Sequence, residues 1–114
     1  MEIQFSDLDN NIRLIKLIGK LDAAGVKAIE TQFADHSAGE KLKVVVDLST
    51  VEFLASPGIQ LLTGNAKSIT SRGGRMVLVS PLPAIRGVLE VTGISSIIPM
   101  YDGLEAAKAG LLAN

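Results

Sequence analysis

The stretch Leu42–Leu48, with the sequence LKVVVDL, constrains the fold of this 114-residue chain more than any other segment. It is apolar and β-branched at successive positions, so neither face of such a strand is suited to water. Strands of this kind occur in parallel sheets whose two faces are both covered. A second run of the same kind, Arg75–Val79, follows after a segment of helical length. Two such strands joined by a helix predict an α/β domain with a largely parallel sheet.

Helical periodicity fills the segments around these two strands. Apolar residues recur at spacings of three and four, or alanine dominates, in Ala23–Phe33, Pro57–Ser71, Pro83–Val91 and Asp102–Leu112. Gly73 and Gly74 are expected to end the second of these helices, and Gly93 the third. The segment His36–Gly39 is expected to be a loop.

Two extended segments, Glu2–Phe5 and Asn11–Gly19, open the chain with turn residues between them, which predicts a β-hairpin. The segment Ser96–Met100 predicts a short strand, and Pro99 within it favours an edge position. The expected order is β-β-α-β-α-β-α-β-α. Residues 1–114 are therefore predicted to form one domain, in which a mixed, mostly parallel sheet packs against four helices.

Composition excludes several kinds of partner. The chain has no cysteine and a single histidine, His36, so neither a disulfide framework nor a transition-metal site is expected. Its 11 basic and 12 acidic residues are dispersed, which argues against nucleic-acid binding. No segment resembles a signal peptide or approaches the ~20 apolar residues of a membrane span. We expect a cytoplasmic protein without metal, cofactor, nucleic-acid or membrane partner.

Enzyme motifs are missing as well. Gly58 and Gly64 have the wrong spacing for a phosphate-binding P-loop, and no Gly-x-Ser-x-Gly elbow is present. Asp47 ends a strand as the phosphate acceptor of a receiver domain does, but the acidic pair and the lysine of such domains are lacking. Asp47 is instead expected to bond backbone amides of the connector that follows. We predict that the chain has no catalytic activity of its own.

The segment Asp47–Ile59 is the most informative for function, because it leads from the carboxyl end of a buried strand into a helix. In open α/β sheets, ligands and partners bind at this edge. Ser56 is predicted as the N-cap of the helix and Pro57 as its first residue. A serine there is an ordinary cap worth about 1 kcal/mol. It is also a position where a phosphate meets free amides and the helix dipole.

Five ordered landmarks give the chain a resemblance to the STAS domain, a family named for sulphate transporters and anti-sigma factor antagonists. They are Gly19–Asp22, Val44–Ser49, Val51–Ile59, Gly73–Gly74 and Leu89–Ile94. The resemblance implies that Ser56 is phosphorylated by a partner that is both an anti-sigma factor and a serine kinase. It further implies that the unphosphorylated chain binds this partner and releases the sigma factor. A serine phosphatase then resets the switch.

The resemblance also implies a partner-binding surface, made of Asp22, Ser56, Pro57, Gly58, Gln60 and Thr63. Asp22 is equally predicted to be the N-cap of the first helix. Gly58 is expected to allow a close backbone approach and to keep the surface flat beside Ser56. Gly64, inside the helix, is expected to make a close packing contact, because a helical glycine otherwise costs about 1 kcal/mol.

Two positions depart from the family pattern. The aspartate that usually precedes the phosphorylated serine is Ala55 here, which removes a negative charge and a hydrogen-bond acceptor. The next position, usually serine, threonine or alanine, is Pro57, which lacks an amide that intrahelical bonding does not need. Family members also serve as accessory subunits of lipid-transport ATPases or of stress-sensing scaffolds. In that alternative, Ser56 is only a contact or a cap.

Overall fold

The computed structural model describes residues 1–113 and confirms the predicted order of elements. The elements are β1 (Glu2–Leu8), β2 (Ile12–Leu21), α1 (Ala23–His36), β3 (Lys43–Leu54), α2 (Ser56–Ser71), β4 (Arg75–Val79), α3 (Pro83–Val91), the 3-10 turn η1 (Ile94–Ser96), β5 (Met100–Tyr101) and α4 (Leu104–Leu112). The bounds of β4 and α3 are those that the sequence predicted.

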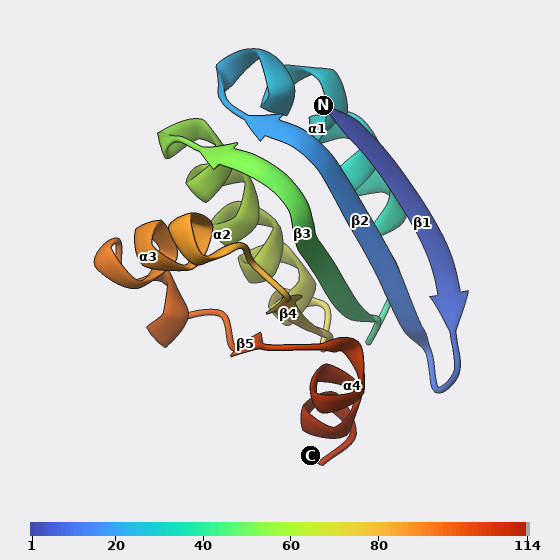
Figure 1. Ribbon diagram of the computed structural model, residues 1–114. Helices are drawn as coiled ribbons and strands as arrows, with labels where there is room; N and C mark the ends of the chain where they lie inside the picture. Colours follow the sequence, from blue (N-terminus) through green and yellow to red (C-terminus); the bar gives the residue numbers. More distant parts are fainter. Residues whose placement is uncertain (114) are drawn as a thin grey trace.

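The strands form one sheet in the order β1-β2-β3-β4-β5, antiparallel between β1 and β2 and parallel elsewhere. The helices α1, α2 and α3 cover one face, and α4 covers the lower part of the other (Figure 1). The central strand β3 sends Val44 and Val46 into the core of the first face and Val45 into that of the second. Burial on both faces therefore explains why this strand is apolar at successive positions.

The predicted hairpin is confirmed, with both strands longer than expected. Asn10 and Asn11 at its tip each have a φ of 62°, as both central residues of a type I′ turn require. Next to the turn, Arg13 Nε donates to Asp7 Oδ1 at 2.6 Å. This hydrogen bond holds the pKa of the Asp7 carboxyl below its ordinary value.

The helix α1 continues to His36, where the sequence predicted a loop. Two guanidinium groups, one from β2 and one from the residue after α2, bond the carbonyl oxygens of its last residue and of its C-cap. Arg13 Nη1 donates to the oxygen of His36 at 2.9 Å, and Arg72 Nη2 donates to that of Ser37 at 2.8 Å. Positive charge at a helix C-terminus is stabilising, which accounts for the additional residues of the helix.

Strand β3 runs six residues further than predicted, because Ser49–Leu54 continue as strand in place of a connector. Its pairing with β2 shifts register between Asp47 and Thr50, which marks a β-bulge. Asp47 Oδ1 accepts from the amide of Ser49 at 2.8 Å, so the expected backbone bond of Asp47 forms inside the strand. Because β4 pairs with β3 only as far as Asp47, the end of β3 extends beyond β4.

The predicted bounds of the last strand, Ser96–Met100, are wrong. The buried side chains of Ile94 and Ile98 lie on either side of a tight turn, in which the amides of Ile97 and Ile98 donate to the carbonyl oxygen of Ile94. Pro99 has no amide, and its carbonyl oxygen accepts from Leu78 at 2.9 Å. The strand β5 is therefore reduced to two residues, although it lies at the sheet edge as expected.

Candidate functional site

The helix α2 begins one residue earlier than the sequence predicted. Ala55 is its N-cap residue, with φ and ψ of −115° and 174°, and Ser56 is already helical. The cause is that the amides of Gly58 and Ile59 both donate to the carbonyl oxygen of Ala55, at 2.9 and 3.2 Å. The predictions that Ser56 caps the helix and that Pro57 is its first residue are therefore wrong. Ser56 is the first helical residue and Pro57 is the second.

The hydroxyl group of Ser56 has no partner within residues 1–113, and the residue is exposed. Two other polar side chains of α2 behave differently. Thr63 Oγ1 and Asn65 Nδ2 donate to carbonyl oxygens one turn earlier in the helix, at 3.0 and 2.8 Å. The Ser56 hydroxyl, in contrast, is open to solvent and to a reaction partner.

Asp22 is the N-cap of α1, as predicted. Its Oδ1 accepts from the amide of Gly25 at 2.8 Å, and its carbonyl oxygen accepts from that of Val26 at 2.9 Å. The carboxylate is therefore engaged in the fold. It is only half-buried, so one side of it still faces solvent.

Asp22→Asn and Asp22→Ala separate the two predicted roles of Asp22. Asparagine caps helices about as well as aspartate, so we expect Asp22→Asn to leave stability nearly unchanged, whereas Asp22→Ala loses about 1 kcal/mol. Urea denaturation measures both effects. If Asp22 also binds a partner through its charge, Asp22→Asn weakens that binding without loss of stability. Equal binding by wild type and Asp22→Asn would show that the residue is a cap only.

The loops that carry Asp22 and Ser56 are held together by the last pairing of β2 and β3. Leu21 pairs with Leu54, and the amide of Ala55 donates to the carbonyl oxygen of Leu21 at 3.0 Å. Asp22 follows Leu21 directly, and Ser56 follows Ala55 directly. The structure therefore brings these two predicted residues to neighbouring loops at the same sheet edge.

Gly58 allows the close approach that was predicted, but it faces inward. A Cβ at this buried position would lie 2.7 Å from Leu54 Cδ1 and 2.8 Å from Leu21 Cβ. The expectation that Gly58 flattens the surface beside Ser56 is therefore wrong. The expectation for Gly64 is wrong in the opposite sense: Gly64 is exposed, and a Cβ there would have nothing within 4 Å.

The remaining predicted contact residues lie along one side of α2. Gln60 is exposed and lies four residues after Ser56, one turn further along the same helix face. Pro57 and Thr63 are half-buried at the margins of this face. The surface available to a partner is therefore centred on Ser56 and Gln60.

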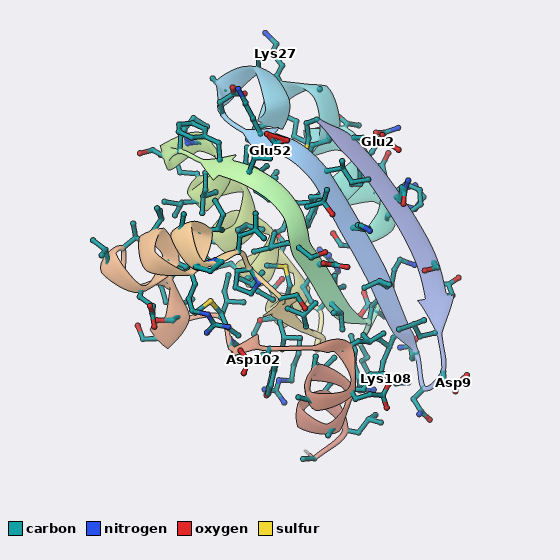
Figure 2. All side chains as sticks on the ribbon, in the orientation of Figure 1. Glu2, Asp9, Lys27, Glu52, Asp102 and Lys108 are labelled. Carbon is teal, nitrogen blue, oxygen red and sulfur yellow. The ribbon has the colours of Figure 1, made fainter. Side chains whose placement is uncertain are left out.

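A polar hollow of about 430 Å³ lies beside the first turn of α1. Its lining comes from the chain start, both strand ends and α1, namely Met1, Gly19, Lys20, Asp22, Ala24, Gly25 and Glu52. Glu52 is found at this upper end of the sheet in Figure 2, with Lys27 of α1 above it. The lining combines the positive charges of Lys20 and the Met1 amino group with the negative charges of Asp22 and Glu52, so the hollow favours neither anions nor cations.

Sequence analysis missed Phe53, which is 48% exposed on β3 three residues before Ser56. Exposed aromatic side chains are enriched in protein interfaces and often carry much of the binding energy. The signal in the sequence was that Phe53 is an aromatic residue in the segment that leads directly to Ser56. We add Phe53 to the candidate surface.

Neither a metal site nor a membrane span is found among the described residues. Residues 1–113 contain no group of three acidic or histidine side chains placed to hold a metal ion. None of the helices in that range has the length and apolar character needed to cross a membrane.

Comparisons with known proteins agree with this architecture. Residues 6–107 match the family model of the STAS domain. A relative from Bordetella bronchiseptica, described as a candidate anti-sigma factor antagonist and named BtrV, is 30% identical over 93 residues. These residues cover 82% of this chain and 80% of the relative.

Three solved structures have similar folds. An anti-sigma factor antagonist from Mycobacterium paratuberculosis superposes with a TM-score of 0.86 at 26% identity, covering 96% of this chain and 92% of that one. SpoIIAA in its unphosphorylated form gives a TM-score of 0.80 at 21% identity, covering 99% and 98%. The Bacillus protein SpoIIAA is also known in a phosphorylated form, with a TM-score of 0.68 at 23% identity, covering 93% and 96%. At these identities, the likeness to SpoIIAA shows the fold alone.

Proposed function

Because the chain belongs to the STAS domain family, we propose that it is an anti-sigma factor antagonist that works by partner switching. In its unphosphorylated form it binds an anti-sigma factor that is also a serine kinase, and the sigma factor is released. Phosphorylation of Ser56 ends this binding, and a serine phosphatase restores it. The chain is the substrate in both steps and supplies no catalysis. We expect it to act in the cytoplasm, where sigma factors meet RNA polymerase.

The observation that carries the proposal is the free, exposed hydroxyl group of Ser56 at the first position of α2. In the proposed reaction, a base of the kinase takes the hydroxyl proton as Ser56 Oγ bonds to the γ-phosphorus of ATP. The bond from that phosphorus to the bridging oxygen breaks, and ADP leaves. An acceptor for this reaction has to reach into the kinase active site. A hydroxyl group that the fold does not use satisfies that need.

The proposed docking surface combines the free face of α2 with the neighbouring strand end. It contains Asp22, Phe53, Ser56, Pro57, Gln60 and Thr63. Gly58, predicted as a contact, is instead assigned to the support of this surface, because it lets α2 pack against Leu21. The names of the relatives favour an anti-sigma factor as the partner.

Mass spectrometry of the intact protein tests the proposal directly. The chain is incubated with an anti-sigma factor of the serine-kinase type from the same organism, together with Mg²⁺ and ATP. We expect the mass to rise by one phosphoryl group in wild type and in Ser68→Ala, a control at an exposed serine of the same helix. Ser56→Ala should gain none. Phosphate on Ser56→Ala, or none on wild type, contradicts the assignment.

A further inference from the structure

The beginning of α2 is unusually poor in hydrogen-bonding groups. A helix ordinarily begins with four amides that have no intrahelical acceptor. Here these four positions are Ala55, Ser56, Pro57 and Gly58. The amide of Ala55 donates to Leu21, Pro57 has no N–H, and the amide of Gly58 donates to the carbonyl oxygen of Ala55. Ala55 at the N-cap has no side-chain acceptor. The amide of Ser56 itself is the one that remains.

Ala55 and Pro57 complement each other in this arrangement. An N-cap side chain usually accepts from the amide of the second or third helical residue. Pro57 removes the first of these donors, and Ala55 removes the acceptor. Neither residue therefore leaves a buried polar group without a partner. Together they start the helix without any side-chain hydrogen bond beside Ser56.

We propose that Ala55 and Pro57 determine how a phosphate on Ser56 is held, namely away from the helix and in solvent. This inference rests on the proposed modification of Ser56. Phosphate groups bind helix N-termini when several free amides point at them. At Ser56 the amide of the second helical residue does not exist, and that of the third is already bonded. The phosphate therefore meets at most one amide, that of Ser56 itself, and otherwise stands in solvent. No carboxylate at position 55 repels it.

The consequence concerns how the switch acts. A phosphate clamped by the helix has its charge partly neutralised, whereas a free phosphate presents nearly two negative charges to whatever approaches the surface. Phosphorylation then blocks docking by its own charge, without a rearrangement of α2. The same exposure leaves the phosphoryl group open to a phosphatase.

Titration of phosphoserine at position 56, followed by phosphorus NMR, tests this inference independently of any kinase. The phosphoserine is incorporated during synthesis of the full chain. In wild type we expect the second pKa of the phosphate near its ordinary value of about 6. In Pro57→Ala the restored amide donates to the dianion, so the midpoint falls and the new amide resonance of residue 57 shifts with it.

Pro83→Ala is the matched control, because it makes the same substitution at the start of another helix. Pro83 is the first residue of α3, and the N-cap of that helix, Leu82, also lacks a side-chain hydrogen bond. Its phosphate midpoint should equal that of wild type. The second determinant is tested by Ala55→Asp, which raises the midpoint by like-charge repulsion, against its neutral counterpart Ala55→Asn.

Two results overturn the inference: equal midpoints in wild type and Pro57→Ala, or a wild-type midpoint already well below its ordinary value. Equal midpoints in Ala55→Asp and Ala55→Asn would show that residue 55 does not influence the phosphate. A chain that no anti-sigma kinase phosphorylates contradicts the proposed function instead, so the two failures are distinguishable.

Discussion

Ser56→Asp is expected to weaken binding to the anti-sigma partner by at least about thirtyfold in Kd. The substitution places a permanent negative charge at the centre of the proposed docking surface, where the interface removes water. An unpaired charge buried in an interface costs about 2 kcal/mol or more. This free energy corresponds to a change of about thirtyfold in Kd. The folded chain itself should be unaffected, because Ser56 is exposed and its side chain makes no bond. Isothermal titration calorimetry with the unphosphorylated protein measures the change.

Two variants make this result specific. Ser56→Ala keeps the surface neutral and should bind within a few-fold of wild type. Ser68→Asp adds the same charge to the same helix at another exposed serine, about 18 Å further along at 1.5 Å per residue. Its binding should also match wild type. If Ser56→Asp binds like Ser68→Asp, the docking surface does not include the start of α2.

The sheet was predictable from sequence because burial on both faces leaves a distinctive pattern. The run Val44–Val46 is fully buried, so a polar side chain at any of its positions would lose its hydrogen bonds to water. Prolines and glycines then set the limits of the elements around it. Pro83 begins α3 and Gly93, with a φ of 79°, follows its end, and both were read correctly.

The end of β3 was not predictable in the same way. Ser49–Leu54 mixes exposed and buried residues around a bulge, so neither a strand period nor a helix period is visible. What keeps these residues extended is pairing with β2, a long-range contact that no local pattern encodes. Ser-Pro at a helix start likewise fits both a cap at Ser56 and a helix that begins there. The bonds from the amides of Gly58 and Ile59 to the carbonyl oxygen of Ala55 decide between them.

The close approach at Gly58 was predicted correctly, but the sides that Gly58 and Gly64 face were not, for a related reason. Which side of a helix faces the core depends on the residue at which the helix begins and on how its first turn is anchored. With Ala55 fixed to Leu21, Gly58 is turned toward Leu21 and Leu54, and Gly64 toward solvent. The sequence identified both glycines as unusual but not the direction that each one faces.

Gly25→Ala is expected to destabilise the protein by about 1–3 kcal/mol, although alanine is the better helix former. Gly25 lies in the first turn of α1, where its Cβ would collide with the backbone carbonyl oxygen of Lys20 and lie 3.2 Å from Asp22 Oδ1. A carbonyl oxygen that belongs to a paired strand cannot turn aside as a flexible side chain can. The overlap therefore moves α1 away from β2 and strains the Asp22 cap. Thermal or urea denaturation measures the loss.

Gly64→Ala is the matched control, since it makes the same change in a helix where the new methyl group meets nothing within 4 Å. There the helix propensity acts alone, and stability should rise by about 0.5–1 kcal/mol. Opposite signs for the two variants are expected. If Gly25→Ala instead gains stability like Gly64→Ala, then α1 does not pack as closely on the end of β2 as described. The placement of the Asp22 loop beside Ser56 would then lose its support, because Leu21 connects the two.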